Sequence, residues 1–123
     1  MTSAMQTAPG IEQGVEPIEA RYLAESRELE IVFNTGACYR WPVDSLQMQE
    51  KTDDGWRDVL GLTNEQLSSV RLWPHKEVVE FSNIEQCFEV SALMRGQLGS
   101  KRWMRKLLKQ QTLEQEKKSL QHL

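Results

Sequence analysis

Apolar and polar side chains alternate in three stretches of the first third of the chain, which is the spacing of strands with one buried face. Gly36 lies between two of these stretches and can supply the positive φ of a short hairpin turn. The pattern predicts a strand followed by a hairpin, and Pro42 marks the end or edge of the last strand. The alternating apolar positions are Ile18, Ala20 and Tyr22, then Leu29, Ile31 and Phe33, then Ala37, Tyr39, Trp41 and Val43.

The stretch 47–60 is mostly polar and is centred on a turn-forming group. We interpret it as a second, more exposed hairpin. Its carboxylates at Asp53, Asp54 and Asp58 lack the spacing and the closing glutamate of a calcium loop, so a solvated turn is the better interpretation. Trp56 beside that turn is the aromatic residue that we expect to be least buried.

Capping signals predict two short helices in the second half of the chain. Thr63 and Gln66 have the spacing of a capping box, and the helix that they begin is expected to end near Val70. Farther along, Ser91 is the expected cap of a helical turn that Gly96 stops. Between the helices, residues 70–72 lead through a turn at 74–76 to a returning strand at 77–81.

The length of 123 residues supports one domain with one core. No apolar stretch approaches the roughly 20 residues that a spanning helix needs, and the polar start of the chain does not resemble a secretory signal. We therefore expect a cytoplasmic protein without a membrane span. Cys38 and Cys87 are far apart in sequence and form no metal-binding motif, so we expect two buried free thiols.

Three stretches resemble a bacterial family known as domain of unknown function 2442. They are Leu29 to Gly36, Leu62 to Val70, and Val79 to Gly96. The resemblance covers residues 18–99 and implies a compact α+β fold, found alone or beside a DNA-binding domain, in proteins similar to regulatory or antitoxin-like accessory proteins. It implies no reaction and no catalytic residues. Neither the 47–60 insertion nor the tail after Gly99 belongs to the family pattern.

The net charge of −3 is distributed unevenly. Residues 1–94 carry a net charge of −9 and residues 95–123 carry +6. Within the basic tail, the charged side chains of residues 101–109 occupy a helical arc of about 140°, opposite Trp103, Met104, Leu107 and Leu108. The segment is therefore a predicted basic amphipathic helix. Its apolar face either docks on the sheet or projects for recognition of an acidic protein, nucleic acid or a membrane surface.

Catalytic chemistry has no signature in this sequence. It contains no phosphate-binding loop, dinucleotide fingerprint, zinc-protease motif or nucleophile elbow. His75 falls in a predicted turn and His122 is next to the terminus. The aromatic residues could form a base-stacking platform, but Tyr22, Phe33, Tyr39 and Trp41 share the face of the core aliphatic residues, which favours burial.

These observations predict an α+β fold, with a small antiparallel sheet of hairpins packed on one or two short helices and a basic amphipathic helix at the C-terminus. Residues 1–17 are expected to be a flexible leader, 18–99 the domain and 100–123 the helix. We expect a non-enzymatic interaction or regulatory module that binds a protein partner, with nucleic-acid binding as the alternative and no metal or cofactor. The expected partner-binding residues are Lys101, Arg102, Trp103, Arg105, Lys106, Lys109 and Trp56.

Overall fold

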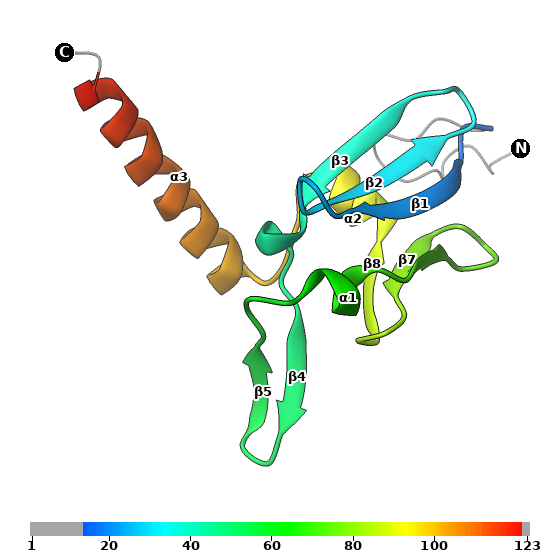
Figure 1. Cartoon of the computed structure of the whole chain (residues 1–123), viewed down its shortest axis with the longest axis horizontal. Coiled ribbons are helices and arrows are strands. Elements are labelled where there is room, and N and C mark those ends of the chain that lie inside the picture. The colour runs from blue at the N-terminus through cyan, green and yellow to red at the C-terminus, as the bar shows by residue number, and fades with distance from the viewer. Residues whose placement is uncertain (1–13, 122–123) are drawn as a thin grey trace, which may run out of the picture.

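Antiparallel hairpins make up most of the computed structural model, which describes residues 14–121 (Figure 1). The sheets have the strand orders β1-β2-β3, β4-β5 and β6-β7-β8. The strands are β1 (Pro17–Leu23), β2 (Glu28–Phe33), β3 (Cys38–Pro42), β4 (Gln49–Thr52), β5 (Gly55–Asp58), β6 (Val70–Leu72), β7 (Val78–Phe81) and β8 (Gln86–Glu89). The helices are the 3-10 turn η2 (Val43–Ser45), α1 (Asn64–Leu67), α2 (Val90–Met94) and α3 (Lys101–Gln121). The protein is thus an α+β fold with a long C-terminal helix.

The hairpin of β2 and β3 confirms the alternation in the sequence. Gly36 has a φ of +90°, and the amide of Phe33 donates to the carbonyl of Ala37 at 2.8 Å to close the turn. The register pairs Leu29 with Trp41 and Ile31 with Tyr39. The predicted leader falls mostly on residues 1–13, which lie outside the described residues, and β1 begins at Pro17.

The core forms where both three-stranded sheets meet the two short helices, and β1 lies beside β6. Trp41 fastens one helix to the first sheet, because its indole Nε1 donates to the carbonyl of Leu93 in α2 at 3.0 Å. The core side chains are 9% exposed or less: Leu29, Ile31, Phe33, Trp41, Val43, Leu46, Met48, Leu67, Val79, Phe81, Val90 and Leu93.

The two short helices follow their capping signals only in part. The capping box of Thr63 and Gln66 is present, but α1 ends at Leu67 rather than near Val70, because β6 begins at Val70. The prediction that Ser91 caps the next helix was wrong: α2 begins at Val90, and Glu89 is its N-cap without a side-chain bond. We also missed β8, in which Gln86 and Phe88 alternate with Cys87 and Glu89, so that no regular apolar period marks the strand.

Two predicted core residues of the first sheet are exposed. Ile18 is 52% exposed because β1 has an irregular register between Pro17 and Glu19, which turns the side chain outward. Tyr39 is on the inner face but is 44% exposed, packing its ring edge-on against Phe33 at 5.5 Å. The alternation correctly predicted which face of the sheet carries Tyr39, but not how far the side chain is buried.

Both cysteines are free and exposed, so the prediction of buried thiols was wrong. Cys38 pairs with Val32 in the ladder, on the same outward face as Arg40, two residues away. Cys87 alternates with Phe88, whose ring contacts Phe81 in the core. In both strands the cysteine occupies the outward position of the period.

Glu30 is 2% exposed, although it points to the outer face of the first sheet. The ladder places it between Arg21 on β1 and Arg40 on β3, and both guanidinium groups donate to its carboxylate. Hydrogen bonds from Arg40 and Arg21 hold the pKa of Glu30 below its usual value. Three strands are therefore tied together by one charged row across their outer face.

Glu85 offers a simple route to a more stable protein. It lies exposed in the turn between β7 and β8 with a φ of +52°, a conformation that costs a residue with a Cβ about 1 kcal/mol or more. We expect Glu85→Gly to raise the free energy of unfolding by about 0.5 kcal/mol, after the extra backbone entropy of glycine is subtracted. Chemical denaturation measures this gain. Glu25→Gly, in a turn residue without positive φ, should lower stability instead; a loss in both variants would contradict the explanation.

Candidate functional site

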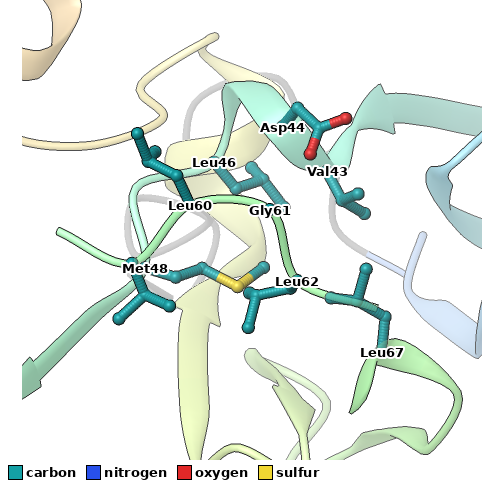
Figure 2. A pocket seen from close by; sticks show the side chains of 9 residues that line it. Val43, Asp44, Leu46, Met48, Leu60, Gly61, Leu62 and Leu67 are labelled. Carbon is teal, nitrogen blue, oxygen red and sulfur yellow. The ribbon is translucent and has the colours of Figure 1, made fainter. Parts of the chain in front are cut away.

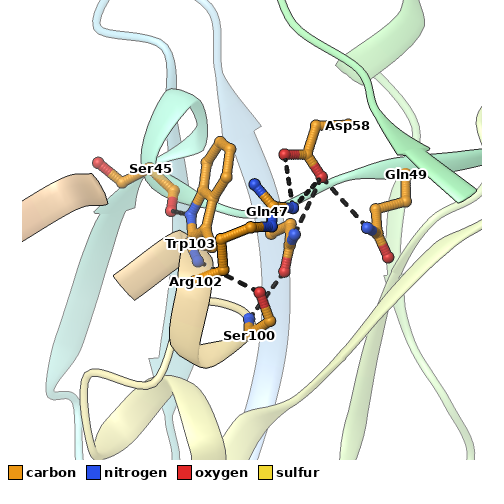
Figure 3. Close-up of polar contacts among 7 residues, drawn as sticks. All are labelled: Ser45, Gln47, Gln49, Asp58, Ser100, Arg102 and Trp103. Atoms are coloured by element: carbon orange, nitrogen blue, oxygen red, sulfur yellow. Dashed lines mark hydrogen bonds and ion pairs between the residues drawn. The ribbon is translucent and has the colours of Figure 1, made fainter. Parts of the chain in front are cut away.

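α3 is anchored to the rest of the protein near its start, and its far end points away from the body (Figures 1 and 3). The hydroxyl of Ser100 accepts a bond from the amide of Trp103 at 3.2 Å, which is an N-cap interaction. Trp103 is 2% exposed, and its indole Nε1 donates to the carbonyl of Ser45 at 2.8 Å. From Leu108 to Leu120 every side chain of α3 is exposed, so the helix projects from a buried root.

The segment before α3 passes very close to the connection between η2 and β4. The amide of Gln47 donates to the carbonyl of Leu98 at 2.9 Å, and the Oε1 atom of Gln47 accepts from the amide of Ser100 at 2.7 Å. A Cβ at Gly99 would lie only 2.6 Å from the Cβ of Gln47. Glycine is therefore required at position 99 by close approach, since any side chain would push the root of the helix away.

Asp58, at the end of β5, joins the second hairpin to the helix (Figure 3). Its carboxylate accepts bonds from the side-chain amides of Gln47 at 2.9 Å and Gln49 at 3.1 Å. Arg102 also donates to both carboxylate oxygens, at 2.9 and 3.2 Å. The bond from Gln47, followed by that from Arg102, lowers the pKa of Asp58, although burial of the carboxylate acts in the opposite direction.

The lowered pKa of Asp58 makes the root of α3 sensitive to acid. Ionised Asp58 stabilises the fold above the unfolded-state pKa of about 3.9, and that contribution is lost as the pH falls through the lower pKa of the folded state. We expect the stability to fall below about pH 4, and Asp58→Asn to remove up to about 1 kcal/mol of that pH dependence, since Arg102 is largely exposed. Urea unfolding between neutral and acidic pH measures it. Identical pH profiles for the two proteins would contradict the assignment.

The structure uses three of the predicted partner-binding residues within the chain. Trp103 is buried, Arg102 is bonded to Asp58, and the ammonium of Lys106 lies 5.3 Å from the centre of the Trp103 ring. The other three basic residues are exposed, and within residues 14–121 none of them has a carboxylate within ion-pair distance. They are Lys101, Arg105 and Lys109.

Trp56 is 66% exposed, as expected, and lies on the same side of the β4–β5 hairpin as Asp58. The two residues are two positions apart on β5, so their side chains point to one face, and Lys51 is the cross-strand neighbour of Trp56. That face is the one that Arg102 approaches at the hairpin base. The predicted partner-binding residues therefore lie on two elements, the β4–β5 hairpin and α3, whose bases are joined by the contact between Asp58 and Arg102.

Asp58 and Gln47 bond to the start of α3, and the sequence analysis predicted this role for neither residue. Asp58 was treated as one of three solvated turn carboxylates. A signal was nevertheless present, because Asp58 lies across the predicted hairpin from Gln49, which places an acidic group and an amide at its base. Only the fold reveals Arg102 as their partner, at a separation of 44 residues.

A pocket of about 180 Å³, lined mostly by apolar side chains, opens beside η2 and α1 (Figure 2). Leu46, Met48 and Leu67 form its buried wall, while Leu60 at its rim is 65% exposed. Its one charged lining residue, Asp44, is bonded to both Nε and Nη2 of Arg27, at 3.0 and 2.8 Å. The pocket thus offers apolar contact and a carboxylate that already has a partner.

Other candidate chemistry can be placed for the described part of the chain. Residues 14–121 contain no group of three or more His, Cys, Asp or Glu side chains arranged to hold a metal ion. His75 lies on an exposed turn, where its Nδ1 accepts the amide of Glu77 at 3.1 Å, and His122 lies outside the described residues. None of the described helices is long and apolar enough to cross a membrane.

Comparison with known proteins gives a likeness of fold. No model of a known protein family and no curated protein matches the sequence. Among solved structures, the chain is similar to a protein of unknown function from Rhodospirillum rubrum ATCC 11170, with 20% sequence identity and a TM-score of 0.58. The match covers 75% of this chain and 99% of the other. At this level of identity the likeness concerns the arrangement of helices and strands.

Proposed function

We propose that the protein is a non-enzymatic interaction module that binds a protein partner through α3 and the β4–β5 hairpin. The observation that carries the proposal is the exposure of α3: in this helix of 21 residues Trp103 is buried, Met104 and Leu107 are half-buried, and every side chain from Leu108 to Leu120 is exposed. A short isolated helix is only marginally stable in water, so a projecting helix gains most from a partner that covers it.

The side chains on the projecting part suit an acidic protein partner. Arg105 and Lys109 are exposed basic groups, and Leu108 and Leu113 beside them are 64% and 49% exposed. A helix that combines apolar anchors with charges is a common recognition element for a groove on another protein. The charges would guide association, while the leucines would supply the buried contact.

Several expectations from the sequence accompany this proposal. We propose a cytoplasmic location, and we propose that residues 18–99 are related to domain of unknown function 2442, whose members are similar to accessory regulatory proteins. The absence of a reaction is part of the same proposal. It is supported by the sequence, which carries no catalytic motif.

A pull-down with matched variants tests the proposed function. The bait is the full chain, compared with Arg105→Glu/Lys109→Glu and with a control of equal charge change farther along the helix, Lys117→Glu/Lys118→Glu. We expect the first variant to lose a stoichiometric protein partner that the wild type and the control retain, with all three melting alike. The proposal would be contradicted if the wild type captured neither another protein nor an untagged copy of the chain in stoichiometric amount, or if all three baits captured it equally.

Nucleic-acid binding is the alternative, and the exposed basic groups at Lys101, Arg105 and Lys109 favour it. The affinity would then fall linearly with the logarithm of the salt concentration, with a slope of about −2 to −3 for three phosphate contacts. Against this alternative, residues 1–94 carry a net charge of −9, which repels phosphate. Electrophoretic mobility shifts of DNA and RNA at low salt would decide between the two.

A further inference from the structure

Two arms leave the body of the protein, and side chains on the outer part of each are exposed (Figure 1). One is the projecting part of α3. The other is the β4–β5 hairpin, whose two strands pair only with each other. An isolated two-stranded hairpin is marginally stable in water, as is an isolated polar helix. Both arms would therefore be stabilised by contact with another surface.

The two arms carry opposite charge. Residues 49–58 of the hairpin have a net charge of −2, and its turn presents the exposed carboxylates of Asp53 and Asp54. From Arg105 to Leu120 the helix has five basic and two acidic side chains, a net charge of +3, with Arg105 and Lys109 exposed. Each arm is thus a suitable electrostatic partner for the other.

Exposed apolar side chains accompany the charges on both arms. Trp56 lies next to the acidic turn and is 66% exposed. On α3, Leu113 follows Lys109 by four residues, so the two share a helical face, and Leu113 is 49% exposed. An aromatic residue beside acids can therefore meet a leucine beside bases, which is a self-complementary combination.

The contact at the root already joins the same two elements. Arg102 of α3 binds Asp58 of β5, and Lys109 and Leu113 lie seven and eleven residues after Arg102, on the same face of the helix. The two arms diverge from this root, so the outer part of the helix does not meet the hairpin of its own chain. A second copy can supply the missing hairpin.

We infer that two copies of the chain associate reciprocally, with the projecting part of α3 of each copy covering the β4–β5 hairpin of the other. The two contacts are equivalent by a two-fold axis, as in most homodimers. In each of them, Asp53 and Asp54 of one copy face Arg105 and Lys109 of the other, and Trp56 packs against Leu113. This inference rests on the proposed function and names its partner as a second copy.

Sedimentation of the full chain tests the inference. A reducing agent must be present, because the exposed thiols of Cys38 and Cys87 could otherwise link copies covalently. We expect a concentration-dependent monomer–dimer equilibrium that weakens as salt is added, because exposed charges are screened. Asp53→Lys/Asp54→Lys, and separately Arg105→Glu/Lys109→Glu, should each raise the dimer dissociation constant by about tenfold or more. Glu25→Lys, an exposed charge reversal on another turn, should leave it unchanged.

Mixing the two reversed variants separates reciprocal pairing from a general loss of association. The first variant has a basic hairpin and a basic helix, and the second has acidic groups on both. Each is repelled by its own copies, but the mixture restores opposite charges at both contacts. We therefore expect a heterodimer from the mixture, with circular dichroism confirming that each variant is folded.

The outcomes distinguish this inference from the proposed function. A wild-type chain that stays monomeric at every concentration, or a mixture that forms no heterodimer although the wild type dimerises, overturns reciprocal pairing. If the monomeric wild type still captures a different protein through Arg105 and Lys109, the proposed function stands and only the inference fails. If it captures nothing, both fail.

Discussion

Trp103→Ala is expected to lower the free energy of unfolding by about 3 kcal/mol or more, the usual cost of truncating a buried tryptophan. The ring is 2% exposed and also donates to the carbonyl of Ser45. Because the rest of α3 has little support from the body, we expect the loss to be accompanied by melting of the helix. Urea unfolding measures the first effect, and the circular dichroism at 222 nm of the native protein measures the second.

Trp56→Ala is the matched control for this prediction, because it removes the same side chain from a site that is 66% exposed. We expect it to change stability by no more than about 0.5 kcal/mol. Trp103→Phe should fall between the two, losing about 1 kcal/mol with the indole hydrogen bond but keeping most of the packing. Equal losses for the two alanine variants would contradict the role of Trp103 as the anchor.

Gly99→Ala is expected to cost about 1 to 3 kcal/mol, as overpacking of a tight contact does. The added Cβ would lie 2.6 Å from the Cβ of Gln47 and 2.7 Å from the Trp103 ring, so the root of α3 must shift. That shift would break the bond between the amide of Ser100 and Gln47. Hydrogen exchange of the first turn of α3, together with the unfolding free energy, measures the effect.

Lys101→Ala serves as the comparison for Gly99→Ala, because it places an alanine two positions away on an exposed site. We expect this change to stay within about 0.5 kcal/mol. If Gly99→Ala behaves in the same way, with unchanged exchange in α3, the close approach at Gly99 does not limit the position of the helix.

The sequence predicted local features well where one short-range interaction decides them. The turn at Gly36 needs a positive φ, and the capping box of Thr63 and Gln66 needs only a spacing of three residues. Both were confirmed. The exposure of Trp56 followed similarly from its place beside a polar turn.

Burial was harder to predict where it depends on pairing between distant strands. Glu30 was missed as a buried residue because its cover comes from Arg21 and Arg40, on two other strands. Cys38 was expected to be buried from its residue type, although its place in the alternation, shared with Arg40, already indicated an outward position. In that case the period was a better guide than the hydrophobicity of the thiol.

The root of the C-terminal helix shows the same limit for the candidate site. The amphipathic pattern of residues 101–109 predicted the helix, but left open whether it docks or projects. The structure contains both, because Trp103 is buried while the side chains from Leu108 to Leu120 are exposed. Asp58 binds Arg102, and Gln47 binds the amide of Ser100. Both partners lie more than 40 residues later in the chain, so no local sequence pattern could predict these contacts.

Because α3 is buried only near its start, a small change in its tilt there is amplified toward its far end. A helix of 21 residues is about 32 Å long, so a tilt of about 10° at the root moves its far end by about 5 Å. Trp103, Gly99 and the Asp58–Arg102 pair help to fix the direction in which the helix leaves the body. A shift of about 1 Å across the Trp103 ring corresponds to a tilt of about 10° and would therefore move the far end of the helix by about 5 Å.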